Sequence, residues 1–356
     1  MSQPKVAKAA RLADVAKAAG VSQGTVSNVF ARPELVREEV RTHVHAVAKS
    51  IGYRGPDPRG RMLRAGKVNA IGIATAEPLS YFFEDPYARE LMRGISEACD
   101  AAGAGLSLVS AKNSEKLSWN IDSALVDGFV LLCIEGGERL VELTRQRQLP
   151  FVALALGKPD PTVSALGIDD FGGARLAAAH LAGLGHRDFA VLAIEFTDGH
   201  AGWVSSADVD AAVYSTARDR MRGYRASLAD AGIDSAGIPV WETQSDKQGV
   251  IAGLEAIFAA PRPPTALLCM SDRLALIALE WLRGRGIAVP GDVSVIGFDG
   301  VPEAALTSPA LTTVEQPIAE LGRRAVKAIL EHDGAVHRAV LDVALVVRAT
   351  TAPPPG

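Results

Sequence analysis

The sequence contains few cysteines and no long apolar run. Its 356 residues include only Cys99, Cys133 and Cys269, and none of them forms a C-x-x-C pair. Cys133 and Cys269 lie in apolar runs, so we expect reduced thiols rather than disulfides. No apolar run reaches the ~18 residues that span a membrane, and the N-terminus lacks the apolar stretch of a signal peptide. These absences predict a cytoplasmic protein without a membrane partner.

The sequence also lacks the motifs of common enzyme and metal sites. It contains no P-loop, no H-E-x-x-H and no G-x-S-x-G. Gly103-Ala104-Gly105 is too short for a dinucleotide-binding fingerprint. His43 and His45 are two positions apart on a predicted helix, so they cannot share a metal ion. We therefore expect a protein that is not an enzyme and that needs no cofactor or metal.

Charge is unevenly distributed along the chain. Residues 1–67 contain 13 lysines and arginines against 5 aspartates and glutamates, whereas the remaining residues contain 24 and 36. The first segment therefore has a net charge of +8, and the rest of the chain has a net charge of −12. A small basic segment on a large acidic body favours a head that binds a polyanion such as nucleic acid.

The basic segment has the apolar spacing of short helices. Leu12–Ala19 forms one helix, Gly20 permits a tight turn, and Ser22 is placed to cap a second helix, Gln23–Phe30. A third helix covers about Arg37–Ile51. A small helical bundle with a polar face is the alternative, and the basic charge disfavours it. A helix-turn-helix places its second helix in the major groove of double-stranded DNA, which predicts these DNA-contacting residues: Ser22, Gln23, Gly24, Thr25, Ser27 and Asn28.

After a segment rich in proline, glycine and arginine (residues 54–67), apolar runs alternate with helical stretches. Continuous apolar strands separated by helices indicate parallel sheets that are covered on both faces. The predicted strands are Ala70–Ala74, Leu106–Ser110, Gly128–Ile134, Phe151–Leu156, Phe189–Ile194, Ala266–Met270, Val293–Gly297 and Leu341–Val347. The predicted helices are Ala88–Ala102, Gly172–Leu184, Asp219–Ala231, Gly249–Ala259, Asp272–Arg285 and Ile318–Glu331. Thr197–Ala217 interrupts this alternation as a long loop.

The run LADVAKAAGVSQGTVSNVF resembles the head of the LacI/GalR family of regulators, in which D-V-A-x-x-A-G-V-S-x-x-T-V-S recurs. The resemblance implies that Gln23, Gly24 and Asn28 occupy the family's variable base-reading positions. Gly24 has no side chain, so we expect less direct readout there. Arg11 and Arg37 replace the usual capping hydroxyls, which predicts caps that are weaker by about 1 kcal/mol each.

The segment from Pro56 to Leu63 resembles the family's hinge, which becomes helical on operator DNA and wedges a leucine into the minor groove. The resemblance implies DNA-contacting roles for Arg61 and Leu63. An apolar wedge unstacks a base step and bends the duplex, which allows more contact with the protein. Gly60 replaces the usual alanine and costs about 1 kcal/mol in a helix, so this hinge is expected to need both DNA and a partner chain.

The resemblance continues through landmarks such as Asp85-Pro86-Tyr87, Gly185-His186-Arg187 and the run from Val289 to Asp299. It implies a body like a periplasmic sugar-binding protein, with two Rossmann-like parallel-sheet subdomains and a ligand cleft at the carboxyl ends of the strands. The expected division is a DNA-binding domain (1–55), a hinge (56–67), a body (68–350) and a disordered tail (351–356). The N-subdomain covers about 68–168 and 316–332, and the C-subdomain about 169–314 and 333–350. The chain is expected to cross between them near residues 169–170, near 314–317, and after the helix ending at about Glu331.

Residues for effector binding are implied by their positions in the family pattern: Tyr87, Phe171, Arg220, Asp272, Asp299 and Gln316. Arg220 has a guanidinium suited to anchoring a carboxylate, a phosphate or paired hydroxyls. Ala155 stands where many members of the family have a ligand-contacting aspartate, so a standard sugar contact is missing. The expected effector is therefore a sugar or another small polar metabolite.

These observations together predict a ligand-responsive, sequence-specific transcriptional regulator. We expect a repressor that binds operator DNA as a homodimer, with an affinity controlled by the small-molecule effector. The alternative is a small-molecule-binding protein with the same body and no role on DNA. The basic head and the missing signal peptide disfavour that alternative.

Overall fold

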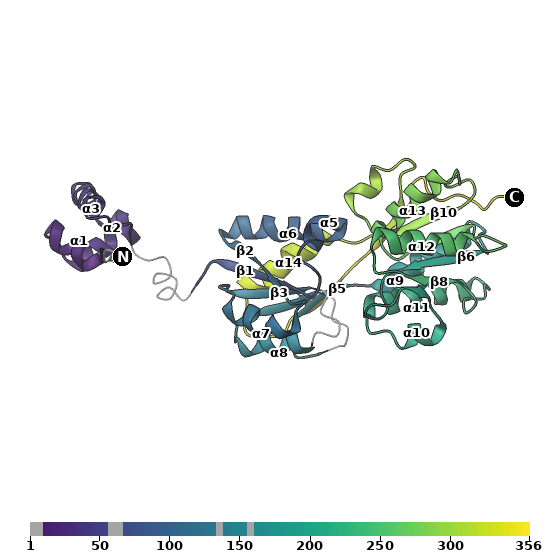
Figure 1. Ribbon diagram of the computed structural model, residues 1–356, viewed down its shortest axis with the longest axis horizontal. Helices are drawn as coiled ribbons and strands as arrows, with labels where there is room; N and C mark the ends of the chain where they lie inside the picture. The colour runs from purple at the N-terminus through teal and green to yellow at the C-terminus, as the bar shows by residue number, and fades with distance from the viewer. Residues whose placement is uncertain (1–9, 56–66, 133–137, 155–159) are drawn as a thin grey trace, which may run out of the picture. The chain divides into compact units, whose positions relative to one another are not determined.

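The computed structural model describes residues 10–55, 67–132, 138–154 and 160–356 (Figure 1). The chain divides at residue 68 into a small head and a large body. The predicted fold class, a helical head followed by an α/β body, is confirmed. No helix in the described part of the chain is long and apolar enough to cross a membrane.

The head consists of three helices and one short 3-10 helix. These are α1 (Leu12–Ala19), α2 (Gln23–Ala31), η1 (Pro33–Leu35) and α3 (Glu38–Ser50). Gly20 ends α1 with φ 65°, a left-handed conformation that glycine adopts without strain. The Ser22 hydroxyl accepts a 3.0 Å hydrogen bond from Thr25 N and so caps α2 as predicted. Arg11 and Arg37 precede α1 and α3, and neither makes a capping hydrogen bond through its side chain. This agrees with the absence of a capping hydroxyl at both positions.

The core of the head is small and is built from alanine and valine. Its buried members are Val15, Ala16, Ala19, Val26, Val29, Val44 and Ala48. Phe30 covers one edge, with its ring centroid 5.0 Å from His45 and 5.6 Å from Tyr53. The His43 ring also donates to Ala19 O over 3.2 Å, which ties α3 to the end of α1. These contacts fix the orientation of the second helix.

The first lobe of the body contains a six-stranded, fully parallel sheet in the order β12-β5-β4-β3-β1-β2. Its strands are β1 (Ala70–Thr75), β2 (Gly105–Ser110), β3 (Gly128–Leu132), β4 (Phe151–Leu154), β5 (Ala165–Ile168) and β12 (Arg338–Leu341). Its helices are α5 (Tyr81–Glu84), α6 (Pro86–Ala102), α7 (Ser114–Ser123), α8 (Glu138–Gln146) and α14 (Ile318–Leu330). Helices α6 and α14 cover one face, and α7 and α8 cover the other (Figure 1). Gly94 allows α6 to approach α14 closely, because a Cβ there would lie 2.0 Å from Ala319 O.

The second lobe contains a seven-stranded sheet in the order β13-β11-β10-β9-β6-β8-β7. Its edge strands β7 and β13 are antiparallel to their neighbours, and its other pairs are parallel. The strands are β6 (Phe189–Ala193), β7 (Gly202–Trp203), β8 (Val240–Glu242), β9 (Ala266–Cys269), β10 (Ser294–Asp299), β11 (Thr312–Glu315) and β13 (Ala344–Val346). The helices are α9 (Asp170–Gly183), α10 (Ser206–Asp210), α11 (Ser215–Asp230), α12 (Lys247–Phe258), α13 (Asp272–Gly284) and η2 (Pro302–Ala305).

The chain passes between the lobes three times. It leaves the first sheet after β5 and returns after β11. The single strand predicted at Leu341–Val347 is confirmed only as β13 (Ala344–Val346) of the second sheet, because Leu341 instead ends a separate strand, β12, in the first sheet. The last crossing therefore follows Leu341 rather than Glu331, and residues 338–341 belong with the first lobe. The parallel pairing of β12 with β5 explains the difference.

The predicted disorder of residues 351–356 is also wrong, because the start of this tail is hydrogen-bonded to the second lobe. His186 is fully buried, and its Nε2–H donates to Ala352 O over 2.9 Å. Ser294 Oγ accepts from Ala352 N over 3.0 Å. Burial lowers the pKa of His186, so the neutral ring is the form in the folded protein. The tail thus supplies a hydrogen-bond acceptor to the buried ring, beside Ser294 Oγ at 3.1 Å from the same nitrogen.

Deletion of residues 351–356 is expected to lower the free energy of unfolding by about 1–3 kcal/mol, because it removes the hydrogen bonds that Ala352 and Thr351 make to His186, Ser294 and Thr312. Urea unfolding of the two chains measures the difference. Deletion of residues 354–356 alone is the control and should leave most of this stability intact. Equal losses from the two deletions would contradict the role of Ala352.

Candidate functional site

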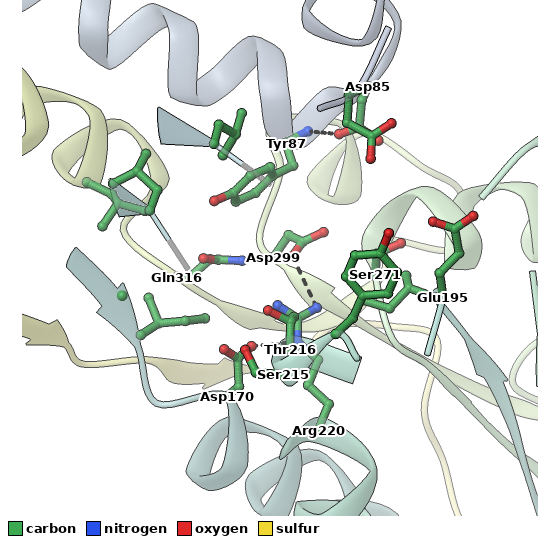
Figure 2. Close-up of a pocket in the computed structure, with 18 of the residues that line it drawn as sticks. Asp85, Tyr87, Asp170, Glu195, Ser215, Thr216, Arg220, Ser271, Asp299 and Gln316 are labelled. Atoms are coloured by element: carbon green, nitrogen blue, oxygen red, sulfur yellow. Dashed lines mark hydrogen bonds and ion pairs between the residues drawn. The ribbon is translucent and has the colours of Figure 1, made fainter. Parts of the chain in front are cut away.

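A cavity of about 690 Å³ lies between the two lobes of the body, where parallel strands of both sheets end (Figure 2). Residues that follow β1, β6 and β9 line it, as the carboxyl ends of parallel strands commonly do in ligand sites. Among the described residues that line it, the polar ones are Glu77, Tyr81, Asp85, Tyr87, Lys112, Asp170, Glu195, Tyr214, Ser215, Thr216, Asp219, Arg220, Gln244, Ser245, Ser271, Arg273, Asp299, Gln316 and Arg338.

The guanidinium of Arg220 lies at the floor of this cavity. Its side chain is only 6% exposed, and Nε donates to Asp170 Oδ1 over 2.7 Å. Nη1 donates to Met270 O and lies 3.6 Å from Asp299 Oδ1. The guanidinium carbon stacks 3.7 Å above the Phe298 ring. Within the described part of the chain, Nη2 has no hydrogen-bond partner, and the side chain points toward the cavity in Figure 2.

Two carboxylates share the one buried guanidinium. Burial raises the pKa of Asp170 and raises that of Asp299 well above its usual value, although Arg220 opposes both shifts. Burial alone would lower the pKa of Arg220, but Asp170 and Asp299 keep it above its usual value. The guanidinium therefore stays charged, and the two carboxylates compete for it.

Asp299 connects this cluster to a crossing between the lobes. Its backbone is strained, with φ 129° at a residue that is not glycine. Its Oδ1 accepts from Gln316 Nε2 over 2.8 Å, and its backbone oxygen accepts from Gln316 N over 3.1 Å. Gln316 lies between β11 of the second lobe and α14 of the first. Two hydrogen bonds thus tie the strained residue to the segment where the chain crosses.

Glu195 and Glu77 line the cavity from opposite lobes. Glu77 follows β1, and Glu195 follows β6. Burial raises the pKa of Glu195 to about 7, with further increases from the negative charges of Glu77, Asp198 and Glu242. Burial also raises the pKa of Glu77, while Lys112 opposes that shift. Both carboxylates accept hydrogen bonds readily, so donors on a ligand would suit them.

The segment predicted as the loop Thr197–Ala217 contains β7 and α10 and is held to the edge of the second sheet. The buried carboxylate of Glu242 accepts from Phe196 N, Thr197 N and the His200 ring over 2.6, 3.1 and 2.6 Å. Tyr214 OH donates to Asp198 near the other end. This anchoring places Tyr214 and the two following residues in the cavity wall.

The structure corrects the prediction for Asp272. This carboxylate is fully buried and is not among the residues that line the cavity. Oδ2 accepts from Gly300 N and Val301 N over 2.8 and 2.9 Å, and Oδ1 accepts from Thr313 Oγ1 over 2.6 Å. Burial raises its pKa to about 6, although these bonds lower it. Asp272 therefore supports the loop behind Asp299 rather than facing a ligand.

The prediction for Phe171 is corrected as well. Its ring is in the first turn of α9, is 40% exposed, and does not line the cavity. Its described ring contact is with the Arg175 guanidinium, 6.0 Å from the centroid. The structure does bring together four of the six predicted effector residues in the cavity: Tyr87, Arg220, Asp299 and Gln316.

The predicted DNA-contacting residues of the head lie on and beside α2. Ser22, Gln23, Gly24 and Asn28 are exposed, while Thr25 and Ser27 are half-buried. Thr25 Oγ1 lies 2.9 Å from the Ser22 hydroxyl, so these two side chains already interact. The hinge residues Arg61 and Leu63, like Cys133 and Ala155, lie outside the described residues.

Sequence reasoning missed several residues of the cavity. Glu195, Gln244 and Ser271 follow strands closely, a position that could have been recognised by the same rule used for Asp299. Asp170 is the first residue of α9 and was noted only as a crossing point. Among the described residues, no group of three or more histidine, cysteine, aspartate or glutamate side chains is arranged to hold a metal ion.

The chain is similar to known regulators along its whole length. Residues 11–55 match the family described as bacterial regulatory proteins, lacI family, and residues 178–351 match a periplasmic binding protein-like domain. The HTH-type transcriptional regulator Rv3575c of Mycobacterium tuberculosis is 39% identical over 99% of each chain. The lac repressor dimer bound to operator and the anti-inducer ONPF superposes with a TM-score of 0.74 at 25% identity, covering 97% of this chain and 100% of that one. The CelR–cellobiose complex gives a TM-score of 0.68 at 27% identity, covering 96% and 99%.

The substitution Glu195→Gln is expected to stabilise the protein at pH 8 and to have little effect near pH 4. The raised pKa of about 7 means that ionising Glu195 opposes folding. This cost begins as pH rises above the unfolded-state pKa of about 4.3 and is complete above 7. Thermal unfolding of both proteins across this pH range measures it. A stabilisation that does not change with pH would contradict a charge effect at Glu195.

Proposed function

This chain belongs to the LacI family of bacterial regulatory proteins, and we propose that it binds operator DNA as a homodimer under the control of an uncharged polyol such as a sugar. Ligand-responsive regulation through a helix-turn-helix head is the activity of this family.

The proposal for an effector is supported most by Arg220. Its side chain is 94% buried by the fold, yet it lines a cavity and leaves Nη2 without a partner in the described part of the chain. Nη2 is not among the fully buried donors of the described residues that lack a partner, so it remains accessible and can donate to an acceptor on a ligand in the cavity. Tyr87, Asp299 and Gln316 surround the same space and are proposed to contact the ligand with it.

The charges around the cavity favour an effector without negative charge. Six carboxylates and four cationic side chains are among the described residues that line it. The positive charge of Arg220 is already shared by Asp170 and Asp299, and Arg273 is paired with Asp85. Like charges disfavour one another at short range, so a carboxylate or phosphate on the ligand would be repelled. Hydroxyl groups can donate to the carboxylates and accept from Arg220.

The proposed assembly follows from the relatives. The lac repressor in the structure described above is a dimer bound to operator. We propose the same arrangement here, with residues 1–55 of each chain in one half-site and residues 56–67 as the hinge. Two symmetric heads would read half-sites about one helical turn apart. Arg61 and Leu63 are proposed to contact the minor groove between them, and the action is proposed to be repression.

The substitutions Gln23→Ala and Asn28→Ala are expected to change the preferred operator sequence and to cost about 1–3 kcal/mol each, because both side chains are exposed on α2 and suit adenine edges. Fluorescence anisotropy on a duplex selected from a random pool measures binding. Affinity should also fall steeply as salt concentration rises, since phosphate contacts release counterions.

The body variant Arg285→Ala is the control for these measurements, because its side chain pairs with Glu255 far from the head in sequence. Deletion of residues 1–67 should abolish DNA binding. Operator binding that survives this deletion, or that ignores salt, would refute the proposed role of the head.

Arg220→Lys is expected to weaken effector binding at least tenfold while operator binding persists. Lysine keeps a positive charge for Asp170 and Asp299 but loses the planar fork with its free Nη2. Thermal shift across a library of neutral sugars, polyols, sugar acids and sugar phosphates identifies the ligand, because binding raises apparent stability by mass action.

The neighbouring Arg218→Lys is the matched control, since Arg218 pairs with Asp219 and does not line the cavity. It should keep the effector response. A library in which only anionic compounds stabilise the protein would contradict the proposed effector class, whatever the result for DNA.

A further inference from the structure

The N-termini of two helices from different lobes lie at the same side of the cavity. Helix α6 of the first lobe begins after Asp85, and helix α13 of the second begins at Asp272. Arg273 Nη1 donates to Asp85 Oδ2 over 3.2 Å, so an ion pair joins the lobes at this point. Both side chains line the cavity, and the exposed fraction is 27% for Arg273 and 10% for Asp85. The pair is therefore more buried than an ordinary surface ion pair.

Asp85 performs two tasks with its two oxygens. Oδ1 accepts from Tyr87 N and Ala88 N over 2.9 and 3.2 Å and so caps α6. Oδ2 remains for Arg273 of the other lobe. The capping bonds hold the carboxylate in one orientation, so little further ordering is needed to form the ion pair. The acceptor is thus fixed on the first lobe before Arg273 approaches.

Arg273 is in an unusual position for a cation. It is the second residue of α13, where the positive end of the helix dipole disfavours positive charge. The residues around it are held firmly, because Ser271 Oγ accepts from Leu274 N and the Asp272 carboxylate is bonded to Gly300 N and Val301 N. The carboxylate of Asp85 offsets the unfavourable position, and it comes from the opposite lobe.

A second ion pair joins the lobes through the same helix. Arg89, one turn after Asp85 on α6, donates both to Glu84 O and to Glu303 of η2 in the second lobe. These side chains are 43% and 38% exposed, so solvent screens this pair more strongly. The start of α6 therefore holds the second lobe through two cationic contacts of unequal burial.

We propose that the Asp85–Arg273 ion pair is a latch that holds the two lobes together at this side of the cavity, with Arg89–Glu303 as a weaker support. The latch sets how often the lobes separate and so how readily an effector enters. Ionic strength weakens it, because the pair is partly exposed. The latch acts in the same way whichever compound is the effector.

Asp85→Asn separates the latch from the helix cap. Asparagine caps helices as well as aspartate does, so α6 stays capped while the charge that attracts Arg273 is lost. The reporter is a cysteine introduced by Thr216→Cys in the cavity wall of the full-length protein. Cys133 is changed to serine so that it does not react, and the other two cysteines, Cys99 and Cys269, are buried. The rate at which a bulky fluorescent maleimide labels this cysteine measures opening.

At low ionic strength, Asp85→Asn and Arg273→Gln are each expected to raise the labelling rate at least threefold. The double variant should be no faster than either single variant, because both remove the same interaction. Salt should accelerate labelling of the parent protein and should have a smaller effect on the variants.

Asp246→Asn is the matched control, since Asp246 caps α12 by the same two-bond pattern and has no ion pair to the described residues of the other lobe. It should label at the parent rate. The latch is refuted if Asp85→Asn labels at the parent rate, if Asp246→Asn accelerates labelling equally, or if the effects of the two latch variants simply multiply.

Discussion

The buried guanidinium of Arg220 is the constraint on which the arrangement of the second lobe depends. A charge that is only 6% exposed needs partners, because an unpaired buried charge is very costly. Those partners come from separate elements: Asp170 begins α9, Met270 follows β9, and Asp299 ends β10. Arg220 is on α11, so four elements must meet around its guanidinium. The residues that pair with Arg220 also form part of the cavity wall. Through Asp299, which is hydrogen-bonded to Gln316, this cluster is connected to a segment where the chain crosses between the lobes.

Most of the fold could be predicted from the sequence wherever burial is carried by apolar residues. Strands such as β3 and β6 are continuous apolar runs, and the helices of the head have clear apolar spacing. Strand β11 was missed because Thr312 and Thr313 give it a polar appearance, although both are fully buried. Their hydroxyl groups are satisfied by Thr351 and Asp272, which lie far away in the sequence. Such long-range satisfaction of polar groups leaves no local signal.

The site could be predicted less completely, because the same sequence signal has two physical meanings. Asp272 and Asp299 both stand where a strand of the second sheet ends, and both resemble ligand-binding residues of the family. The backbone decides between them. At Asp299 the left-handed φ of 129° accompanies a side chain in the cavity wall, whereas Asp272 turns its carboxylate onto Gly300 N. The tail was mispredicted for a related reason, since its backbone acceptor serves a histidine more than 160 residues earlier.

A regulator of this kind works only if its states are close in free energy. Reversing a two-state population from 1:99 to 99:1 takes about 5.5 kcal/mol of differential ligand binding, and allosteric couplings are typically about 1–3 kcal/mol. An interaction between the lobes worth much more than that would resist any small effector. Single ion pairs that solvent still reaches, such as Asp85–Arg273 and the more exposed Arg89–Glu303, suit this range better than a large apolar interface would. The firm part of the structure is the Arg220 cluster within one lobe. In the proposed mechanism, the contacts that change lie between the lobes, where binding of a small ligand can compete with salt-sensitive ion pairs.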